Sequence, residues 1–253
     1  MILASHFRKH WAEAPDDFFA VEAAGLRWLA EAGSAAVVPV LSVGPTEITV
    51  ARLESSPPTL AAASAFGTAL AGTHRAGADS FGAPPPGWDG DGYIGRQRLR
   101  LRPERQWGRF YAEQRMLPYA RAARDLDHLT AQQLRVIERV AERIAAGDFD
   151  DSRRPARIHG DLWSGNLVST ADGMVLIDPA AHGGHGITDL AMLALFGAPH
   201  LDTILAAYAE AAELPLGWRQ LIGLHQLHPL LVHAVSHGPS YGSEAAAIAL
   251  RYL

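Results

Sequence analysis

The sequence predicts an α+β fold of two lobes, a small strand-rich lobe over residues 1–56 and a larger, mainly helical lobe over residues 57–253. Three observations lead to this prediction. Strand-like runs around a Gly-Pro turn suggest a hairpin over 37–54, alanine-rich helical patterns dominate the rest of the chain, and one further strand pair over 167–178 interrupts them. The stretch SSPPT separates the two parts because its prolines break regular structure.

The small lobe is expected to begin with a strand over 5–11 and a helix over 16–33. Asp16 or Asp17 is in position to cap the first turn of this helix, and Gly33 follows its last residue. Both ends of the segment therefore carry helix-terminus signals.

Glu22 lies on the apolar stripe of this helix, four residues from both Phe18 and Leu26. A buried carboxylate needs a partner, because an unpaired buried charge costs several kcal/mol. Lys9 is the only lysine in the chain and could supply that partner, although chance survival in an arginine-rich composition is an equal alternative.

The larger lobe is expected to consist of helices joined by loops. A capping box formed by Thr130 and Gln133 opens one of them, and Gly147 closes it. The Pro- and Gly-rich segment 81–92 is expected to be an irregular loop. The predicted helices cover residues 59–77, 107–126, 129–148 and the chain from about 190 to its end.

Composition bounds the function. A chain of 253 residues with 48% hydrophobic and 19% charged residues is expected to form a compact globular protein. Its net charge of −5 argues against a nucleic-acid partner, and it has no apolar run long enough to span a membrane. Without cysteines or a recognisable signal sequence, a cytoplasmic location is expected. Nothing in the sequence specifies an oligomeric state.

The segment IHGDLWSGN, residues 158–166, precedes the predicted strand pair LVSTADGMVLID. If its loop covers three residues, 171–173, Asn166 faces Asp178 across the hairpin, whereas a two-residue loop shifts this register by one. Asp161 lies just before, so three oxygen-bearing side chains would meet at the mouth of the hairpin.

This set of oxygens suits Mg²⁺ bound to nucleotide phosphates, which usually takes one or two carboxylates from the protein. The spacing also matches the kinase arrangement, in which an Asp accepts the hydroxyl proton and an Asn five residues later and a second Asp hold the metal. Each element alone arises easily by chance. Together with Lys9 and Glu22 upstream, they predict a phosphoryl-transfer site.

The motifs HGDLWSGN, LIDPA, GGH and DLAMLALFG resemble those of the fructosamine kinase (ketosamine 3-kinase) family, which has the aminoglycoside phosphotransferase-like, protein-kinase-like fold. FYAEQRMLPYAR and LHQLHPLLVHAV are also similar to that family, so the resemblance covers nearly the whole chain. It implies a two-lobed kinase-like fold and transfer of phosphate from ATP, with Mg²⁺, to a ketosamine, most naturally at its 3-hydroxyl. The ketosamine could be a small molecule or protein-bound.

The resemblance implies that Asp161 is the catalytic base and that Asn166 and Asp178 bind Mg²⁺. Lys9, paired with Glu22, would position the ATP phosphates.

Three further residues receive roles by the same resemblance. Trp163 would shape the sugar pocket, with a core anchor as an equal alternative. His159 is a candidate for the substrate pocket, although orienting the loop through a backbone hydrogen bond is favoured for it. Asp189 would brace the catalytic loop.

The chain departs from the family pattern in two places. Only eight residues precede Lys9, where the family has a hairpin with a phosphate-covering loop, so a reduced N-terminal lobe without the Gly-rich hairpin is expected. His182 and the pair Gly186-Ile187 replace Tyr and Arg-Glu, which would alter the wall beside the metal site. Two alternatives therefore stay open: a kinase for another small alcohol of the aminoglycoside or choline type, and a degenerate nucleotide-binding protein without activity.

Other patterns are expected to be structural. GPSYG, residues 238–242, fits the motif of a hydrolase nucleophile, but a helical pattern precedes it where a strand is required. The basic run 96–105 is expected to be a solvated face, with a border of the substrate cleft as the alternative. The histidines expected to lie in the core or at caps, and not to bind zinc, are His225, His228, His233 and His237.

Overall fold

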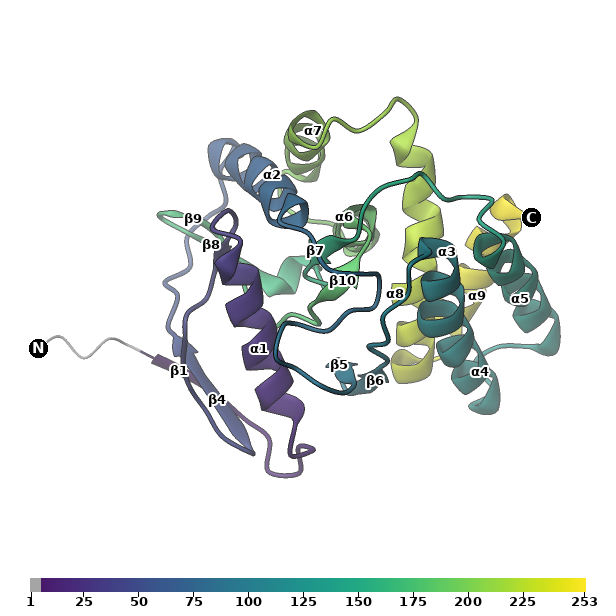
Figure 1. Cartoon of the computed structure of the whole chain (residues 1–253), viewed down its shortest axis with the longest axis horizontal. Coiled ribbons are helices and arrows are strands. Elements are labelled where there is room, and N and C mark those ends of the chain that lie inside the picture. Colours follow the sequence, from purple (N-terminus) through teal and green to yellow (C-terminus); the bar gives the residue numbers. More distant parts are fainter. Residues whose placement is uncertain (1–5) are drawn as a thin grey trace, which may run out of the picture.

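A computed structural model describes residues 6–253. The first five residues of the predicted small lobe, including Ser5 of the first predicted strand, lie outside this range. A three-stranded sheet of order β1-β4-β3 and the helix α1 occupy one side of the molecule (Figure 1). Their core is formed by α1 side chains such as Phe19 and Leu26 against Ile48 of the sheet. The bounds are β1 (His6–His10), α1 (Phe18–Glu31), β3 (Val40–Val43) and β4 (Glu47–Ala51).

The predicted strand, helix and hairpin of this part are therefore confirmed, with small shifts at their ends. Asp17 is at the N-cap of α1, but its side chain makes no capping hydrogen bond. Gly33, just beyond α1, has a φ of +63°, which is the left-handed conformation that glycine adopts at helix ends.

A second sheet joins this part to the predicted strand pair over 167–178. The short strand β2 (Ala36–Val37) pairs in parallel with β9 (Gly173–Leu176), which pairs antiparallel with β8 (Leu167–Thr170). A boundary at residue 56 would therefore separate segments that share a sheet, and it stays a prediction.

The hairpin of β8 and β9 has a two-residue loop, because Thr170 pairs directly with Gly173. The register follows from this pairing: Asn166 lies opposite Ile177, whose N–H donates to the Asn166 carbonyl at 3.1 Å. The expectation that Asn166 faces Asp178 depended on a three-residue loop and is wrong, while the alternative register, shifted by one, is correct.

The larger part is mainly helical, as predicted, and fills the side of Figure 1 opposite the first sheet. The capping box of Thr130 and Gln133 is present, and Gly147 follows the helix with a φ of +90°. The predicted helix over 107–126 includes one irregular turn, the π-helical segment Tyr111–Met116. The helices are α2 (Leu60–Arg75), α3 (Trp107–Phe110), α4 (Leu117–Asp125), α5 (Ala131–Ala145), α6 (Gly186–Phe196), α7 (Leu201–Ala211), α8 (Ile222–His237) and α9 (Pro239–Ala249).

Two more strand pairs were not expected from the sequence. β7 (Ala156–Ile158) pairs with β10 (His182–Gly184) and leads into the segment IHGDLWSGN. β5 (Gly92–Ile94) pairs with β6 (Gln97–Leu99), so a hairpin replaces part of the predicted irregular loop and of the solvated basic run. Leu99 and Leu101 of that run are buried, because alternate residues of the hairpin segment face the core.

Two of the patterns expected to be structural can be placed in the fold. Within GPSYG, Gly238 ends α8 and Pro239 begins α9, so the strand that a nucleophile elbow requires does not precede it. His225 and His228 are buried on α8. Across residues 6–253, no helix combines the length and the hydropathy needed to cross a membrane.

Candidate active site

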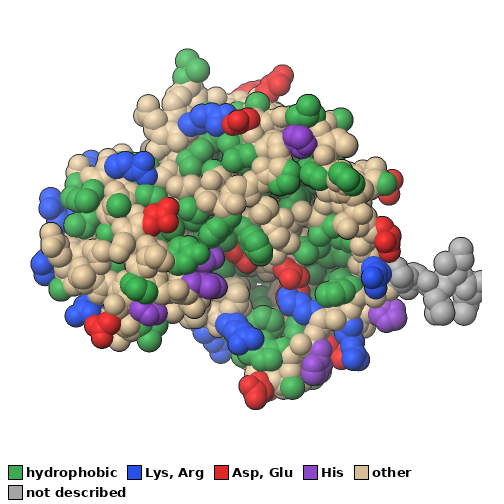
Figure 2. Space-filling view, turned by 180° about the vertical axis from the view of Figure 1, so that it is seen from behind, with side chains coloured by type: hydrophobic (Ala, Val, Ile, Leu, Met, Phe, Trp, Pro, Cys, Tyr) green, Lys and Arg blue, Asp and Glu red, His purple; other side chains and the backbone are tan. Residues whose placement is uncertain are grey.

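A cleft of about 310 Å³ lies between α1, β1, the segment after β7 and the β5–β6 hairpin. Acidic and basic side chains meet beside a hollow near the middle of the face shown in Figure 2. The cleft contains all five residues that sequence reasoning assigned to ATP, metal and proton transfer: Lys9, Glu22, Asp161, Asn166 and Asp178.

Lys9 makes two ion pairs across this cleft. Its Nζ lies 2.9 Å from Glu22 Oε2, the predicted partner, and 3.1 Å from Asp178 Oδ2, which was not predicted to contact it. The β1–β4 register sets Lys9 opposite Ile48, in the layer that packs on α1, and Glu22 is only 7% exposed there. Burial by itself lowers the pKa of Lys9, but the carboxylates of Glu22 and Asp178 outweigh it and hold that pKa above its ordinary value.

Asn166 links the two aspartates at the mouth of the hairpin. Its amide nitrogen donates to Asp161 Oδ2 at 3.2 Å, to the Asp161 carbonyl at 2.8 Å and to the Asp178 carbonyl at 3.3 Å. Asp178 has a φ of +51°, a conformation that side chains other than glycine rarely adopt, and it turns the chain out of β9 toward Lys9. Asp161, Asn166 and Asp178 thus line the same cleft, although their register differs from the expected one.

The donors present suit a magnesium ion that arrives with a nucleotide. Within residues 6–253, no three His, Asp or Glu side chains gather closely enough to hold a metal ion by themselves. Mg²⁺ in kinases is held by one or two protein groups and by phosphate oxygens, so the Asp178 carboxylate and the Asn166 amide oxygen are the groups that would complete its coordination.

Asp161 has the pKa expected of a proton acceptor near neutral pH. Burial raises the pKa of Asp161 to about 7; the hydrogen bond from Asn166 lowers it, while the charges of Asp178 and Asp189 raise it further. A general base works best when its pKa is close to the working pH.

The loop that contains Asp161 is held by Asp189, which is 0% exposed. Its two carboxylate oxygens accept the backbone N–H groups of His159 at 2.7 Å and Gly160 at 2.9 Å. His74 Nε2 donates to the same carboxylate at 3.0 Å, and no sequence signal had marked His74. Gly160 has a φ of +81°, and a Cβ there would overlap the Ala180 carbonyl oxygen, so this turn requires glycine.

His159 and Trp163 have different surroundings. The His159 ring is 0% exposed; its Nε2–H donates to the Ile177 carbonyl at 2.8 Å, and its Nδ1 accepts the Asp161 N–H at 3.2 Å. Because this ring does not reach the cleft, the suggestion that it contacts substrate is corrected, and its bonds are those of a loop-orienting residue. Trp163 is 42% exposed and lines the cleft, so it is not a core anchor.

The fold matches that of small-molecule phosphotransferases. A Thermobifida fusca structure, assigned provisionally as a fructosamine-3-kinase, is 46% identical, with a TM-score of 0.88 over 97% of this chain and 85% of that one. The streptomycin–ATP complex of APH(2'')-IIa aligns with a TM-score of 0.62 at 12% identity, over 97% of this chain and 84% of that one. The expected kinase-like α+β fold is thereby confirmed.

The sequence comparison identifies the family. The model that describes fructosamine kinase matches residues 4–253. The chain belongs to the fructosamine kinase family. A probable ketoamine kinase of Enterococcus faecium is 32% identical over 177 residues, which are 70% of this chain and 62% of that protein, so the aligned part spans less than two thirds of the relative.

Within this fructosamine kinase family member, the residues that depart from the family pattern lie outside the lining of the cleft. His182 is buried behind the cleft, where its Nδ1 donates to the Ala180 carbonyl at 2.7 Å. Gly186 and Ile187 line a different cavity, at the start of α6. The expected change in the wall beside the metal site is therefore corrected, because none of these residues lines the cleft.

The wall opposite the aspartates was missed by sequence reasoning. Arg96, at the tip of the β5–β6 hairpin, lies 4.9 Å above the ring of Trp11, and both line the cleft. Tyr93 of the same hairpin donates to Asp17 Oδ1 at 2.6 Å and so ties the hairpin to α1. The only sequence signal for this wall was the basic run 96–105. Its alternative interpretation, that it borders the substrate cleft, is correct for Arg96, which lines the cleft.

Proposed function

We propose that this protein transfers the γ-phosphoryl group of ATP to a hydroxyl of a ketosamine, at its 3-hydroxyl. The observation that carries the proposal is that Lys9, Glu22, Asp161, Asn166 and Asp178 line one cleft in a member of the fructosamine kinase family. This combination contains each of the protein groups that phosphoryl transfer needs, namely a phosphate-binding cation, two metal donors and a base.

Lys9 would bind the ATP phosphates in this cleft. Its ammonium group bridges Glu22 and Asp178 at 2.9 and 3.1 Å, and ATP phosphates would replace Asp178 as its second anionic partner. Glu22, buried behind it, keeps Lys9 in place as the nucleotide enters. Mg²⁺ held by Asn166 and Asp178 would supply positive charge to the phosphate oxygens.

Asp161 would contact the hydroxyl group that accepts the phosphate. A substrate hydroxyl within hydrogen-bond distance of its carboxylate would be oriented toward the phosphate and would lose its proton to Asp161 as the new O–P bond forms. Asn166, which donates to the same carboxylate at 3.2 Å, fixes its direction.

The substrate is supported by the walls of the cleft. The exposed ring of Trp163 offers a flat apolar face of the kind on which a sugar can pack, and Trp11 with Arg96 closes the other side. A polar sugar carrying an amine substituent fits a cleft with both carboxylates and aromatic rings.

The experiment compares acceptors directly. The protein is incubated with Mg-ATP and either a ketosamine such as fructosyl-lysine or an amino alcohol such as choline or kanamycin, and ADP release is followed. We expect turnover with the ketosamine and none with its 3-deoxy analogue, and phosphorus NMR should place the product phosphate on O3. Equal or faster turnover of the amino alcohols would reject the ketosamine, and a Mg-ATP thermal shift without any transfer would reject the kinase activity.

The Asp161→Asn variant tests the mechanism. It should lower kcat by about 10²- to 10⁴-fold, the usual contribution of a general base, and leave the Kd for Mg-ATP within about threefold of the wild type. Asp172→Asn, in the exposed hairpin loop, is the control for removing one negative charge. Loss of ATP affinity in parallel with kcat would show that Asp161 is not the base.

A further inference from the structure

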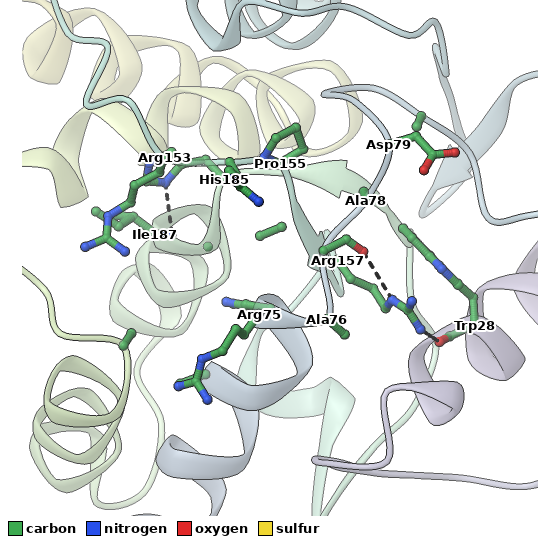
Figure 3. A pocket seen from close by; sticks show the side chains of 18 of the residues that line it. Trp28, Arg75, Ala76, Ala78, Asp79, Arg153, Pro155, Arg157, His185 and Ile187 are labelled. Carbon is green, nitrogen blue, oxygen red and sulfur yellow. Dashed lines mark hydrogen bonds between the residues drawn. The ribbon is translucent and has the colours of Figure 1, made fainter.

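A second cavity, of about 810 Å³, lies away from the active-site cleft and shares no lining residue with it. Figure 3 shows it between the C-terminal end of α2, the start of α6 and the segment that leads into β7, with Trp28 of α1 on one side. Neither the proposed reaction nor the comparisons give this cavity a role.

The lining of this cavity is strongly basic. It includes four arginines and a single carboxylate, that of Asp79, although the whole chain has a net charge of −5. Figure 3 shows Arg75 and Arg153 on one side of the cavity and Arg157 beside Trp28 on the other. An acidic protein that concentrates arginines around one concavity has a local attraction for anions that its overall charge does not provide. The four arginines are Arg75, Arg153, Arg154 and Arg157.

Most of this positive charge is not neutralised by carboxylates. Arg75 donates to the Ala211 carbonyl at 2.6 Å, and Arg157 donates to the carbonyls of Trp28 and Gly77. These carbonyl groups orient the two guanidinium groups but carry no net charge, so they do not neutralise them. Burial lowers the pKa of Arg157.

The remaining two arginines differ from each other. Arg153 has one acidic neighbour, Asp151, at 3.5 Å, whereas no ion pair to Arg154 occurs within residues 6–253. An anion in the cavity would therefore meet three guanidinium groups that have no carboxylate partner among residues 6–253, those of Arg75, Arg154 and Arg157.

The start of α6 lies in the same wall as the arginines. Gly186 and Ile187, the first two residues of this 11-residue helix, form part of the wall. The N-terminal end of a helix has a partial positive charge and attracts phosphate and carboxylate groups. At this helix the Ile187 N–H already donates to His185 Nδ1 at 3.2 Å, and the buried Asp189 carboxylate lies in the first turn, so the arginines are the groups that attract an anion.

We propose that this cavity binds a small organic phosphate, such as a phosphorylated sugar. Its phosphate would be held by Arg75 and Arg154, since guanidinium groups bind phosphate oxygens in pairs. Its carbon skeleton would lie toward Pro84 and Pro86, which form an apolar part of the lining. The volume is in the range of small-molecule sites, which are usually about 300 to 1,000 Å³.

Binding is measured by isothermal titration calorimetry in EDTA, which removes the divalent metal on which the active-site cleft would depend for holding phosphates. The probes are glucose 6-phosphate, glucose and inorganic pyrophosphate. We expect glucose 6-phosphate to bind with a Kd of about 1 mM or tighter, pyrophosphate to compete with it, and glucose to show no binding. Because the readout is binding, it does not depend on the proposed phosphotransferase activity.

The double variant Arg75→Gln/Arg154→Gln tests the location. It should weaken glucose 6-phosphate binding about tenfold or more, equivalent to at least about 1.4 kcal/mol. The control Arg121→Gln/Arg135→Gln removes the same charge from exposed positions outside the cavity and should bind as the wild type does. If the double variant unfolds, the single variant Arg154→Glu replaces it.

Three results would overturn the proposal: no binding of glucose 6-phosphate to the wild type, equal binding by the double variant, or equal weakening in the control. If pyrophosphate bound and glucose 6-phosphate did not compete with it, the proposal of an organic phosphate ligand would also be rejected, because inorganic phosphate would then be the ligand.

Discussion

Replacing Asp189 by asparagine would remove a charge that lies beneath the catalytic loop. The Asp189 carboxylate is fully buried and accepts from His159 N–H, Gly160 N–H and His74 Nε2. An asparagine has nearly the same shape but keeps only one acceptor oxygen, and its NH₂ group would face one of these donors. At least one buried backbone N–H then has no partner.

The size of the effect follows from these bonds. A hydrogen bond to a charged group contributes about 1.5–3 kcal/mol, and a buried donor left without a partner costs about 1–3 kcal/mol. We therefore expect the free energy of unfolding to fall by about 3–5 kcal/mol, which corresponds to a decrease in Tm of roughly 10 °C for a chain of this size.

Catalysis should be affected through Asp161, which follows Gly160 directly. The loop would lose one of the two N–H bonds that position it, so kcat should fall by about tenfold or more at temperatures where the variant is folded. The KM for ATP should change little, because Lys9 and Glu22 lie on β1 and α1, which do not contact Asp189.

Urea unfolding and steady-state kinetics are measured for Asp189→Asn, with Asp172→Asn as the control. Asp172 carries the same charge but is exposed in the two-residue loop, so its replacement should change stability by less than about 0.5 kcal/mol. If Asp189→Asn were as stable and as active as this control, Asp189 would not brace the loop, and the reasoning from its hydrogen bonds would be refuted.

Three further predictions follow from the same contacts. Lys9→Arg should lower kcat/KM for ATP about tenfold or more, because a planar guanidinium cannot replace an ammonium between Glu22 and Asp178; kinetics equal to the wild type would contradict a specific need for lysine. Gly160→Ala should lower the free energy of unfolding by about 2 kcal/mol or more, since a Cβ there overlaps the Ala180 carbonyl, and calorimetry showing an unchanged Tm would reject this. The free energy of unfolding should be highest above pH 6.5 and fall on acidification. Below that pH the histidines of the unfolded chain become protonated, whereas the buried histidines of the folded chain stay neutral; burial lowers the pKa of His228 to about 3. Allowing for the opposite contribution of carboxyls such as Asp161, the loss should be about 2–3 kcal/mol per pH unit, and equal urea midpoints at pH 7 and pH 5 would contradict it. The fully buried histidines with a lowered pKa are His159, His182, His225 and His228.

Local signals predicted the elements that depend on neighbours in sequence. The capping box of Thr130 and Gln133 identified the start of α5, because its hydrogen bonds join residues three positions apart. The hairpin around residues 171–172 was also expected, but its loop length was not determined, since Ala-Asp-Gly is compatible with two registers. The one-residue difference moved Asp178 out of the position opposite Asn166 and into contact with Lys9.

The amino-acid sequence by itself determined the family and the kinase-like α+β fold. It also marked the candidate site residues, because motif residues such as Asp161 and Asn166 are close together in the chain and the need of buried Glu22 for a cation pointed to the single lysine. Only the tertiary structure decided which distant groups meet. His74 meets Asp189, Lys9 meets Asp178, and four arginines line one cavity together with the start of α6. The first two of these contacts join residues more than 100 positions apart in the chain. Their distances are set by helix packing, which follows from the shapes of many buried side chains together.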